Sequence, residues 1–524
     1  MKKMVIISLA LMGIGALNVG QAVNLDSNGL GEVLIYPYYT VRNGSDTLLS
    51  IGNTTNNVKA IKIRFLEAEN SREVLDFNLY LPAYSVWVSS LTSSETGTVL
   101  TTSSALCTVP AIPSTGVAFS NTAYSEQQAD GGDTSLDRTR EGYIEIIEMG
   151  VVTDSGSFTP ATAATPVNSM PQDCATLTAA WSAGGQWASN PNDGITFSPG
   201  GLKGNGVLIN LNKNSNYNYV AAAIVNFASA ANHTPPGALS PSLADNSGTS
   251  DVLTPTGEIV TSTWSNKIDA VSAVLMSKSI VNEYNTDASL NAATNWVVTF
   301  PTKHFYVQSG SPNANGVVST TPIPATAPFT SFFTQGGACE EVKLAISTSP
   351  KNKSSLCWET NVITFNNAVV LESLLLLNVD APTDQESGIA HLFFPSVNGD
   401  HSITDSSGVI YQGLPVVGFS AEEFVNGTLI YGITLNHGFA RKIKAPTDND
   451  PTLSSTGLLT NLLSGNLPVE GSGVGVVGAG RLGNVGNPIT GNGRLGSKLG
   501  DVGDPLGGLG GDGIIGGGGF GFIF

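Results

Sequence analysis

Charge is scarce in this sequence. Charged residues occupy 12% of its 524 positions, about half of the usual share of about 25%. Apolar residues make up 41% of the chain, so it has the material for folded cores. It does not have the composition of a highly charged disordered protein.

Basic residues are the rarer of the two signs, with 23 Lys and Arg against 41 Asp and Glu and a net charge of −18. Nucleic-acid binding depends on Lys and Arg side chains that meet phosphates. The acidic balance therefore excludes nucleic acid as an expected partner, and it also disfavours anionic membranes. It suits solubility or the attraction of divalent cations.

Catalytic signatures are missing as well. The chain contains no HExxH, no GxSxG and no Walker loop, the patterns that carry zinc hydrolysis, a nucleophile elbow and phosphate binding. The five histidines are scattered, and none shares metal-ligand spacing with another: His233, His304, His391, His401 and His437. We therefore predict a non-enzymatic protein without a cofactor.

The N-terminus carries the longest apolar run, Met4–Leu17, behind two lysines. Gly20-Gln21-Ala22 follows with small residues at the positions that a signal peptidase reads. This order is typical of a secretory signal peptide, and the run is short of the about 20 residues that span a bilayer. We expect a mature chain that begins at Val23, with 21 basic and 41 acidic residues and a charge of −20. After signal removal the sequence predicts no membrane span, because the run around Leu374–Leu377 is flanked by polar residues and has the pattern of a buried strand.

Only four cysteines occur, Cys107, Cys174, Cys339 and Cys357. An even number in an exported chain indicates two disulfides, for which three connectivities are open. We favour Cys107–Cys174 and Cys339–Cys357, because each pair shares one region of the chain. The absence of a CxxC spacing makes redox or zinc chemistry a weak alternative.

Period-two alternation is the dominant pattern of the chain. Ile61, Ile63 and Phe65 alternate with Lys62 and Arg64, and similar alternation recurs over 75–79 and 84–88. Such segments, separated by turn residues, predict strands with one buried face and a mainly β, sandwich-like fold. Asn43-Gly44 and Asn426-Gly427 are typical of tight hairpin turns.

The stretch IGNTTNNVKAIKIRF and the following LYLPAYSVWV resemble the immunoglobulin-like sandwiches of bacterial surface proteins. In those proteins an Asn-rich turn and a Leu-Pro turn each precede a strand. The resemblance implies a fold only and carries no activity with it.

Composition shifts divide the chain into six ranges. Residues 228–258 predict a long surface loop, and apolar spacing predicts one short helix within 267–283. The ranges are a signal peptide (1–22), a first β region (23–152), a second β region with long loops (153–308), a linker (309–337), a third β region (338–445), and a linker with a Gly-rich tail (446–524).

Acidic residues gather between 130 and 148. Asp130, Asp133 and Asp137 could supply oxygen ligands to calcium, although their spacing does not match the EF-hand loop. The alternative is local pairing of these acids with Arg138 and Arg140.

Glu141 and Glu145 share strand parity, so they could face one substrate as the acid pair of a glycosidase. This pair supports the first alternative function, a secreted carbohydrate-active hydrolase on a β scaffold. The alternating Phe520, Phe522 and Phe524 at the C-terminus support the second, an outer-membrane β-barrel.

We predict a secreted or cell-surface structural or adhesive protein. This prediction rests on the signal peptide, the low share of charged residues, the two predicted disulfides and the missing catalytic motifs. We expect it outside the cell or on its surface, with the periplasm as an alternative. Self-association or contact with other surface components is the expected form of partnership, because strand edges and an apolar, Gly-rich tail both invite pairing.

Overall fold

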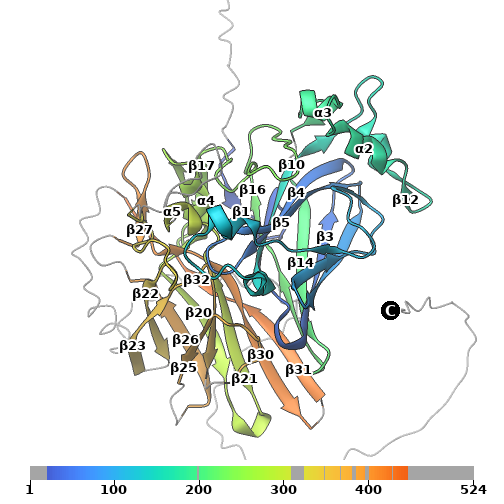
Figure 1. Ribbon diagram of the computed structural model, residues 1–524. Coiled ribbons are helices and arrows are strands. Elements are labelled where there is room, and N and C mark those ends of the chain that lie inside the picture. Colours follow the sequence, from blue (N-terminus) through green and yellow to red (C-terminus); the bar gives the residue numbers. More distant parts are fainter. Residues whose placement is uncertain are drawn as a thin grey trace, which may run out of the picture. The chain divides into compact units, whose positions relative to one another are not determined.

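The computed structural model describes most of the chain between residues 21 and 445. The described ranges are 21–197, 200–307, 324–346, 349–365, 368–380, 385–395, 400–427 and 429–445. Within them the fold is mainly β, as the sequence predicts, and consists of several separate sheets (Figure 1). Every strand pair is antiparallel except β24 with β25. The signal peptide up to residue 20, most of the linker and the tail lie outside the described residues.

Eight strands form the central sheet, in the order β1-β16-β2-β10-β4-β5-β8 with β13 beside β10. Every residue of β2, β4 and β10 is buried, so the middle of this sheet is covered on both faces. The strands are β1 (Asn24–Leu25), β2 (Val33–Thr40), β4 (Val58–Glu67), β5 (Glu73–Leu81), β8 (Cys107–Val109), β10 (Glu141–Val152), β13 (Ile195–Thr196) and β16 (Ala222–Val225).

A six-stranded sheet packs on one face of the central sheet, in the order β15-β14-β3-β6-β7-β9. Burial alternates along β3 and β14, because one face meets the core and the other meets solvent. Tyr39, Phe65 and Trp87 are among the aromatic residues of that core. The strands are β3 (Ser45–Asn53), β6 (Val86–Ser94), β7 (Gly97–Thr101), β9 (Val117–Ala118), β14 (Leu202–Asn210) and β15 (Ser215–Val220).

Two five-stranded sheets, β23-β22-β26-β20-β32 and β25-β24-β21-β30-β31, share a second core around Trp296 and Leu392. Each sheet has one strand of the range 153–308, β20 or β21, between strands of the range 338–445. In the central sheet, β16 of the second range joins β2 of the first. The strands are β20 (Ser279–Asn285), β21 (Ala293–Thr299), β22 (Glu340–Ile346), β23 (Ser349–Leu356), β24 (Thr360–Phe365), β25 (Leu376–Val379), β26 (Ser387–Phe393), β30 (Val417–Asn426), β31 (Leu429–Asn436) and β32 (Gly438–Ala440).

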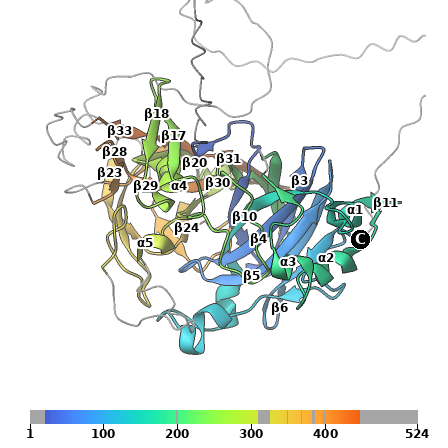
Figure 2. The ribbon, with the colours of Figure 1, turned by 90° about the horizontal axis from the view of Figure 1, so that it is seen from above.

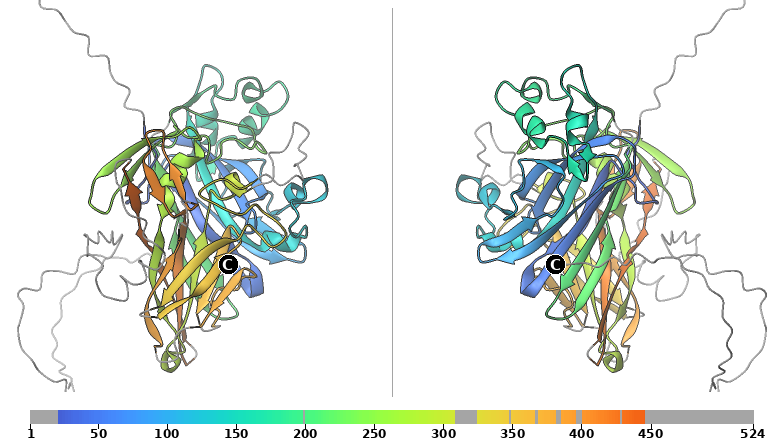
Figure 3. Two further views of the ribbon diagram at one scale, coloured as in Figure 1. Left: turned by 90° about the vertical axis from the view of Figure 1, so that its left-hand side faces the viewer. Right: turned by 90° about the vertical axis from the view of Figure 1, so that its right-hand side faces the viewer.

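Short elements complete the described fold. The small sheets contain β11 (Pro166–Val167) with β12 (Met170–Pro171), β17 (Thr249–Leu253) with β18 (Ile259–Thr263), β19 (Met276–Ser277) with β29 (Leu414–Pro415), and β27 (Ser402–Thr404), β28 (Ile410–Gln412) and β33 (Lys442–Lys444). The α-helices are α1 (Pro160–Ala164), α2 (Cys174–Ala180), α3 (Gln186–Ser189), α4 (Ile268–Leu275) and α5 (His304–Val307). The 3₁₀ turns are η1 (Arg42–Gly44), η2 (Thr122–Tyr124), η3 (Glu126–Gln128), η4 (Leu136–Arg140) and η5 (Ala288–Leu290). Figure 2 shows α1, α2 and α3 apart from α4, and in Figure 3 the segment that carries them projects beyond the strands.

The helix predicted within 267–283 is confirmed over α4 only. The backbone turns to an extended conformation at Met276, and β20 begins at Ser279. Residues of β20 pair in register with β26 and alternate between buried and more exposed positions, so strand pairing prevails over the helical spacing.

Two other sequence expectations are corrected. Asn43 and Gly44 have positive φ angles of 51° and 81°, but they turn the chain from the central sheet into the six-stranded sheet, so they do not close a hairpin. The leucine run forms the edge strand β25 only from Leu376 onward, and Leu374 is 67% exposed, so this run is not a buried strand. At Asn426-Gly427 the expected hairpin joins β30 to β31.

Both favoured disulfides are present, Cys107–Cys174 and Cys339–Cys357. The first ties β8 of the central sheet to α2, and therefore holds the helical segment to the sheet. Disulfides of this kind indicate an oxidising, extracytoplasmic environment.

The first disulfide should stabilise the fold more than the second. Its cysteines are 67 residues apart, against 18 for the other pair, and in the chain-entropy model such loops contribute about 4 and about 3 kcal/mol. We expect Cys107→Ser with Cys174→Ser to lower the free energy of unfolding in denaturant by the larger amount. A larger loss from Cys339→Ser with Cys357→Ser would contradict this ranking.

Candidate functional site

Charged side chains line the face of β4 that the sequence assigned to solvent. Lys62 and Arg64 are buried, and so are the flanking Lys59 and Glu67. The expectation of one buried face per strand is therefore wrong for β4. Ile61, Ile63 and Phe65 enter the core shared with the six-stranded sheet, and the opposite, charged face is also closed.

Acids on the neighbouring strands pair with these cations. Lys59 Nζ lies 2.5 Å from Glu148 Oε1 on β10, and Lys62 Nζ lies 3.0 Å from Asp76 Oδ2 on β5. Arg64 Nε donates to Glu73 Oε2 at 2.8 Å. Because an unpaired buried charge is very costly, these pairs fix the partners of β4 on both sides.

Residues 232–241, the covering segment, close this charged face with backbone oxygens. Lys62 Nζ donates to the Pro235 carbonyl at 2.9 Å. The Arg64 guanidinium donates to three further carbonyls, those of Ala238, Leu239 and Pro241. Gly237 N–H in turn donates to the Asp76 carboxylate. This part of the predicted surface loop therefore supplies further hydrogen-bond acceptors to cations that already pair with acids of β5.

The three calcium candidates are distributed over separate partners. Asp130 receives hydrogen bonds from both terminal nitrogens of Arg138, at 3.0 and 2.8 Å. Asp133 accepts from Ser135, and Asp137 pairs with Arg42 and with Arg140. The local pairing with Arg138 and Arg140, the alternative that the sequence offered, is therefore present. Among the described residues no group of three His, Cys, Asp or Glu side chains could hold a metal ion. Calcium binding by these acids stays a prediction.

Arg138 is the most completely paired of the buried cations. Its side chain is fully buried and also donates to both oxygens of Glu67, at 2.7 and 2.9 Å, while the Tyr124 ring lies 4.5 Å from its Cζ atom. Burial alone would raise the pKa of Asp130, but the hydrogen bonds and charge of Arg138 hold that pKa at about 2.

Glu141 and Glu145 are each 2% exposed. Glu141 accepts from Arg42 Nε at 2.8 Å, from Leu374 N–H at 3.0 Å and from Tyr38 at 3.1 Å. Burial raises the pKa of Glu145, although the charges of His304 and Arg64 oppose the rise. The structure therefore places both carboxylates inside the protein, and the hydrogen bonds that Glu141 accepts come from Arg42, Leu374 and Tyr38.

A shallow hollow with a cavity volume of about 10 Å³ opens beside β10, lined by Glu32, Glu148, Met149, Gly150, Phe197, Ala228, Ala230 and Ala231. Glu32 accepts a hydrogen bond from Ala228 N–H at 2.9 Å, and its other oxygen has no hydrogen-bond partner among the described residues. Burial raises the pKa of Glu32 to about 7, and the Glu148 carboxylate adds to the rise. The volume of this hollow is far below the about 300–1,000 Å³ typical of pockets for drug-sized ligands.

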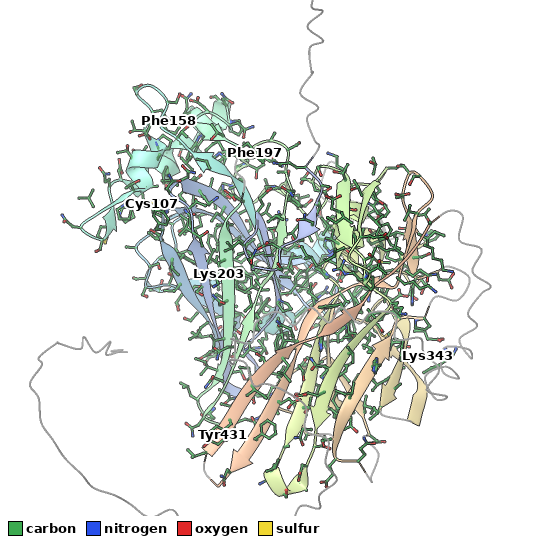
Figure 4. The ribbon with its side chains drawn as sticks, turned by 180° about the vertical axis from the view of Figure 1, so that it is seen from behind. Cys107, Phe158, Phe197, Lys203, Lys343 and Tyr431 are labelled. Carbon is green, nitrogen blue, oxygen red and sulfur yellow. A yellow bond between two sulfur atoms is a disulfide. The ribbon has the colours of Figure 1, made fainter. Side chains whose placement is uncertain are left out.

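A further exposed feature among the described elements is the outer face of the six-stranded sheet, called the open face here. Its side chains are mainly aliphatic, hydroxyl or amide. They are Asn216, Asn218 and Val220 on β15, Lys203, Asn205, Val207 and Ile209 on β14, Asp46, Leu48, Ser50 and Gly52 on β3, Val86, Val88, Ser90, Thr92 and Ser94 on β6, and Val99 and Thr101 on β7. Asp46 and Lys203 are the charged members of this set, and Figure 4 shows Lys203 on its strand.

Sequence reasoning did not identify the buried cations, Glu32 or the open face. One signal was available for the cations: segments predicted as strands carried acids as well as bases, and the structure places acids of β5 and β10 beside the bases of β4. For the open face, the alternation assigned the buried side of β3 correctly, but on β6 it was wrong. Val86 and Val88 are 55% and 42% exposed, and Trp87 is buried. The order of strands in the sheet was also needed to join the exposed positions.

Comparison of the chain with known protein families, curated proteins and solved structures finds no match. None of the helices in the described ranges combines the length and the apolar character needed to cross a membrane.

Arg138→Met should lower the free energy of unfolding by about 3–5 kcal/mol, because it leaves buried carboxylates without their cation. The matched control is Lys353→Met, which removes an exposed pair with Glu341 and should cost less than about 1 kcal/mol. Denaturant unfolding measures both. Equal effects of the two substitutions would show that burial does not govern these pairs.

Glu32 should make the protein less stable as the pH rises. Its pKa is about 7 in the folded protein against 4.5 ordinarily, so its stabilising contribution is complete below about 4.5 and is lost as the pH passes through 7. Glu32→Gln should reduce the difference in unfolding free energy between about pH 5 and about pH 8. The exposed control Glu258→Gln should not, and a Glu32→Gln curve parallel to wild type would refute the assignment.

Proposed function

We propose that this chain is an exported, non-enzymatic structural protein of the cell surface that contacts other macromolecules through its open face. The observation that carries the proposal is the contrast between the two sides of the fold. Asp130, Asp137 and Glu141, acids that the sequence singled out for chemistry, pair with arginines, while a broad, nearly uncharged sheet face is exposed.

The cross-linking of the fold supports a mechanical role. Two disulfides connect parts that are distant in sequence, and the buried ion pairs join β4 to β5 and β10. Both features limit the conformations open to the chain outside the cell, where no cellular system refolds it.

Fractionation of producing cells tests the location and the absence of catalysis together. We expect the mature, disulfide-bonded chain in the envelope or released fraction, where added protease reaches it. Incubation with neutral and acidic polysaccharides should release no reducing ends. The proposal fails if the chain is cytoplasmic, or if sugars are released by the wild type and not by Glu145→Gln, because that result would assign hydrolysis to this carboxylate.

A further inference from the structure

The open face has an aliphatic centre and polar margins. Leu48 of β3 lies opposite Val207 on β14, and Val88 on β6 lies opposite Ser50 of β3. Leu48, Val86 and Val88 are 37%, 55% and 42% exposed. Leu48 and Val207 lie side by side on neighbouring strands, whereas the partner of Leu48 on β6 is Ser90. The face is therefore a mixed surface of aliphatic and hydroxyl side chains, and its exposed aliphatic groups favour contact with another protein surface.

The two charges of the open face lie at opposite ends of neighbouring strands. Lys203 is opposite Gly52, and Asp46 is opposite Ile209, so six residues of β3 separate the two positions. This corresponds to ~20 Å along the strands and ~5 Å across them. Neither side chain forms an ion pair with a described residue. Both charges are therefore available to pair with a partner.

A two-fold axis that lies in the plane of the face and runs across the strands reverses the strand direction. Applied to a second copy, it brings the Lys203 end of one face against the Asp46 end of the other, and does so twice. An isologous interface requires this kind of self-complementarity. The two aliphatic centres meet at the axis in the same arrangement.

The size of the face fits a pair of copies. At ~3.3 Å per residue and ~4.8 Å per strand, a sheet with three nine-residue strands and shorter neighbours offers roughly 600 Å² per copy, against about 800 Å² in a standard interface. A total of roughly 1,200 Å² lies at the lower end of specific interfaces. Association should therefore be reversible and depend on concentration.

We propose that the open face is a self-association interface, in which two copies pack face to face with Lys203 of each against Asp46 of the other. This rests on the proposed function only in taking the open face as the contact surface. Sugar platforms use exposed aromatic rings, and the outward positions of β3, β6, β7, β14 and β15 hold none. The remaining charges are one of each sign, which favours a second copy over a strongly charged partner.

Charge reversal in the full mature chain tests the arrangement. Sedimentation across a concentration series should show dimers of the wild type, and Lys203→Asp or Asp46→Lys should each raise the dissociation constant at least tenfold. The double variant Asp46→Lys/Lys203→Asp should return it to within threefold of wild type. An equimolar mixture of the two single variants should form mixed dimers, because every pair across the axis is then opposite in charge.

Two control variants distinguish a loss of association from a loss of folding, and further outcomes distinguish a second copy from another partner. Lys353→Asp, on an exposed pair of another sheet, should leave the dissociation constant unchanged, and Val88→Lys should weaken association without lowering the melting temperature. A wild type that stays monomeric throughout the series, or a double variant without rescue, overturns the proposal. A monomer that sits at the cell surface and binds a neutral polysaccharide in a Val88-dependent way also overturns it, while leaving the proposed function intact.

Discussion

The pairing of buried charges across β4 is the constraint on which the rest of the structure depends. Lys59, Lys62 and Arg64 stand inside the protein, and each has an acid on a neighbouring strand. Charges removed from water are tolerated only with partners that also satisfy their hydrogen bonds. A shift of β4 by one residue would separate these pairs and would also turn Ile61, Ile63 and Phe65 out of their core, so charges and apolar contacts define the same register against β5 and β10.

The same constraint explains the placement of distant segments. The covering segment lies across β4 because its carbonyl oxygens complete the hydrogen bonds of Lys62 and Arg64. Arg138 holds Glu67 and Asp130 together and so attaches η4 to the end of β4. These buried acids thereby hold parts of the fold together. The exposed surface available for contacts includes nearly uncharged faces such as that of the six-stranded sheet.

Local patterns predicted the local features of the fold. Period-two alternation identified β4, β5 and β6, and the positions of the cysteines favoured the two disulfides that are present. The patterns could not show that Lys62 and Arg64 are buried, because the cover comes from residues more than 150 positions away. The sequence did offer Arg138 and Arg140 as local partners of the acids between 130 and 137, and both pairs are present. It could not show that Arg42, 95 residues from Asp137, pairs with it as well. Alternation within β3 and β14 was visible, but their adjacency across a gap of about 150 residues was not.

Hydrogen exchange of the covering segment tests most directly whether the charged face of β4 is closed. Gly237 N–H donates to the Asp76 carboxylate, so the account predicts that peptides from 232–241 exchange nearly as slowly as those of β4 and β10. Exchange of this segment at the rate of a free loop, while β4 stays protected, would contradict the account, because the buried cations would then reach solvent without their carbonyl partners.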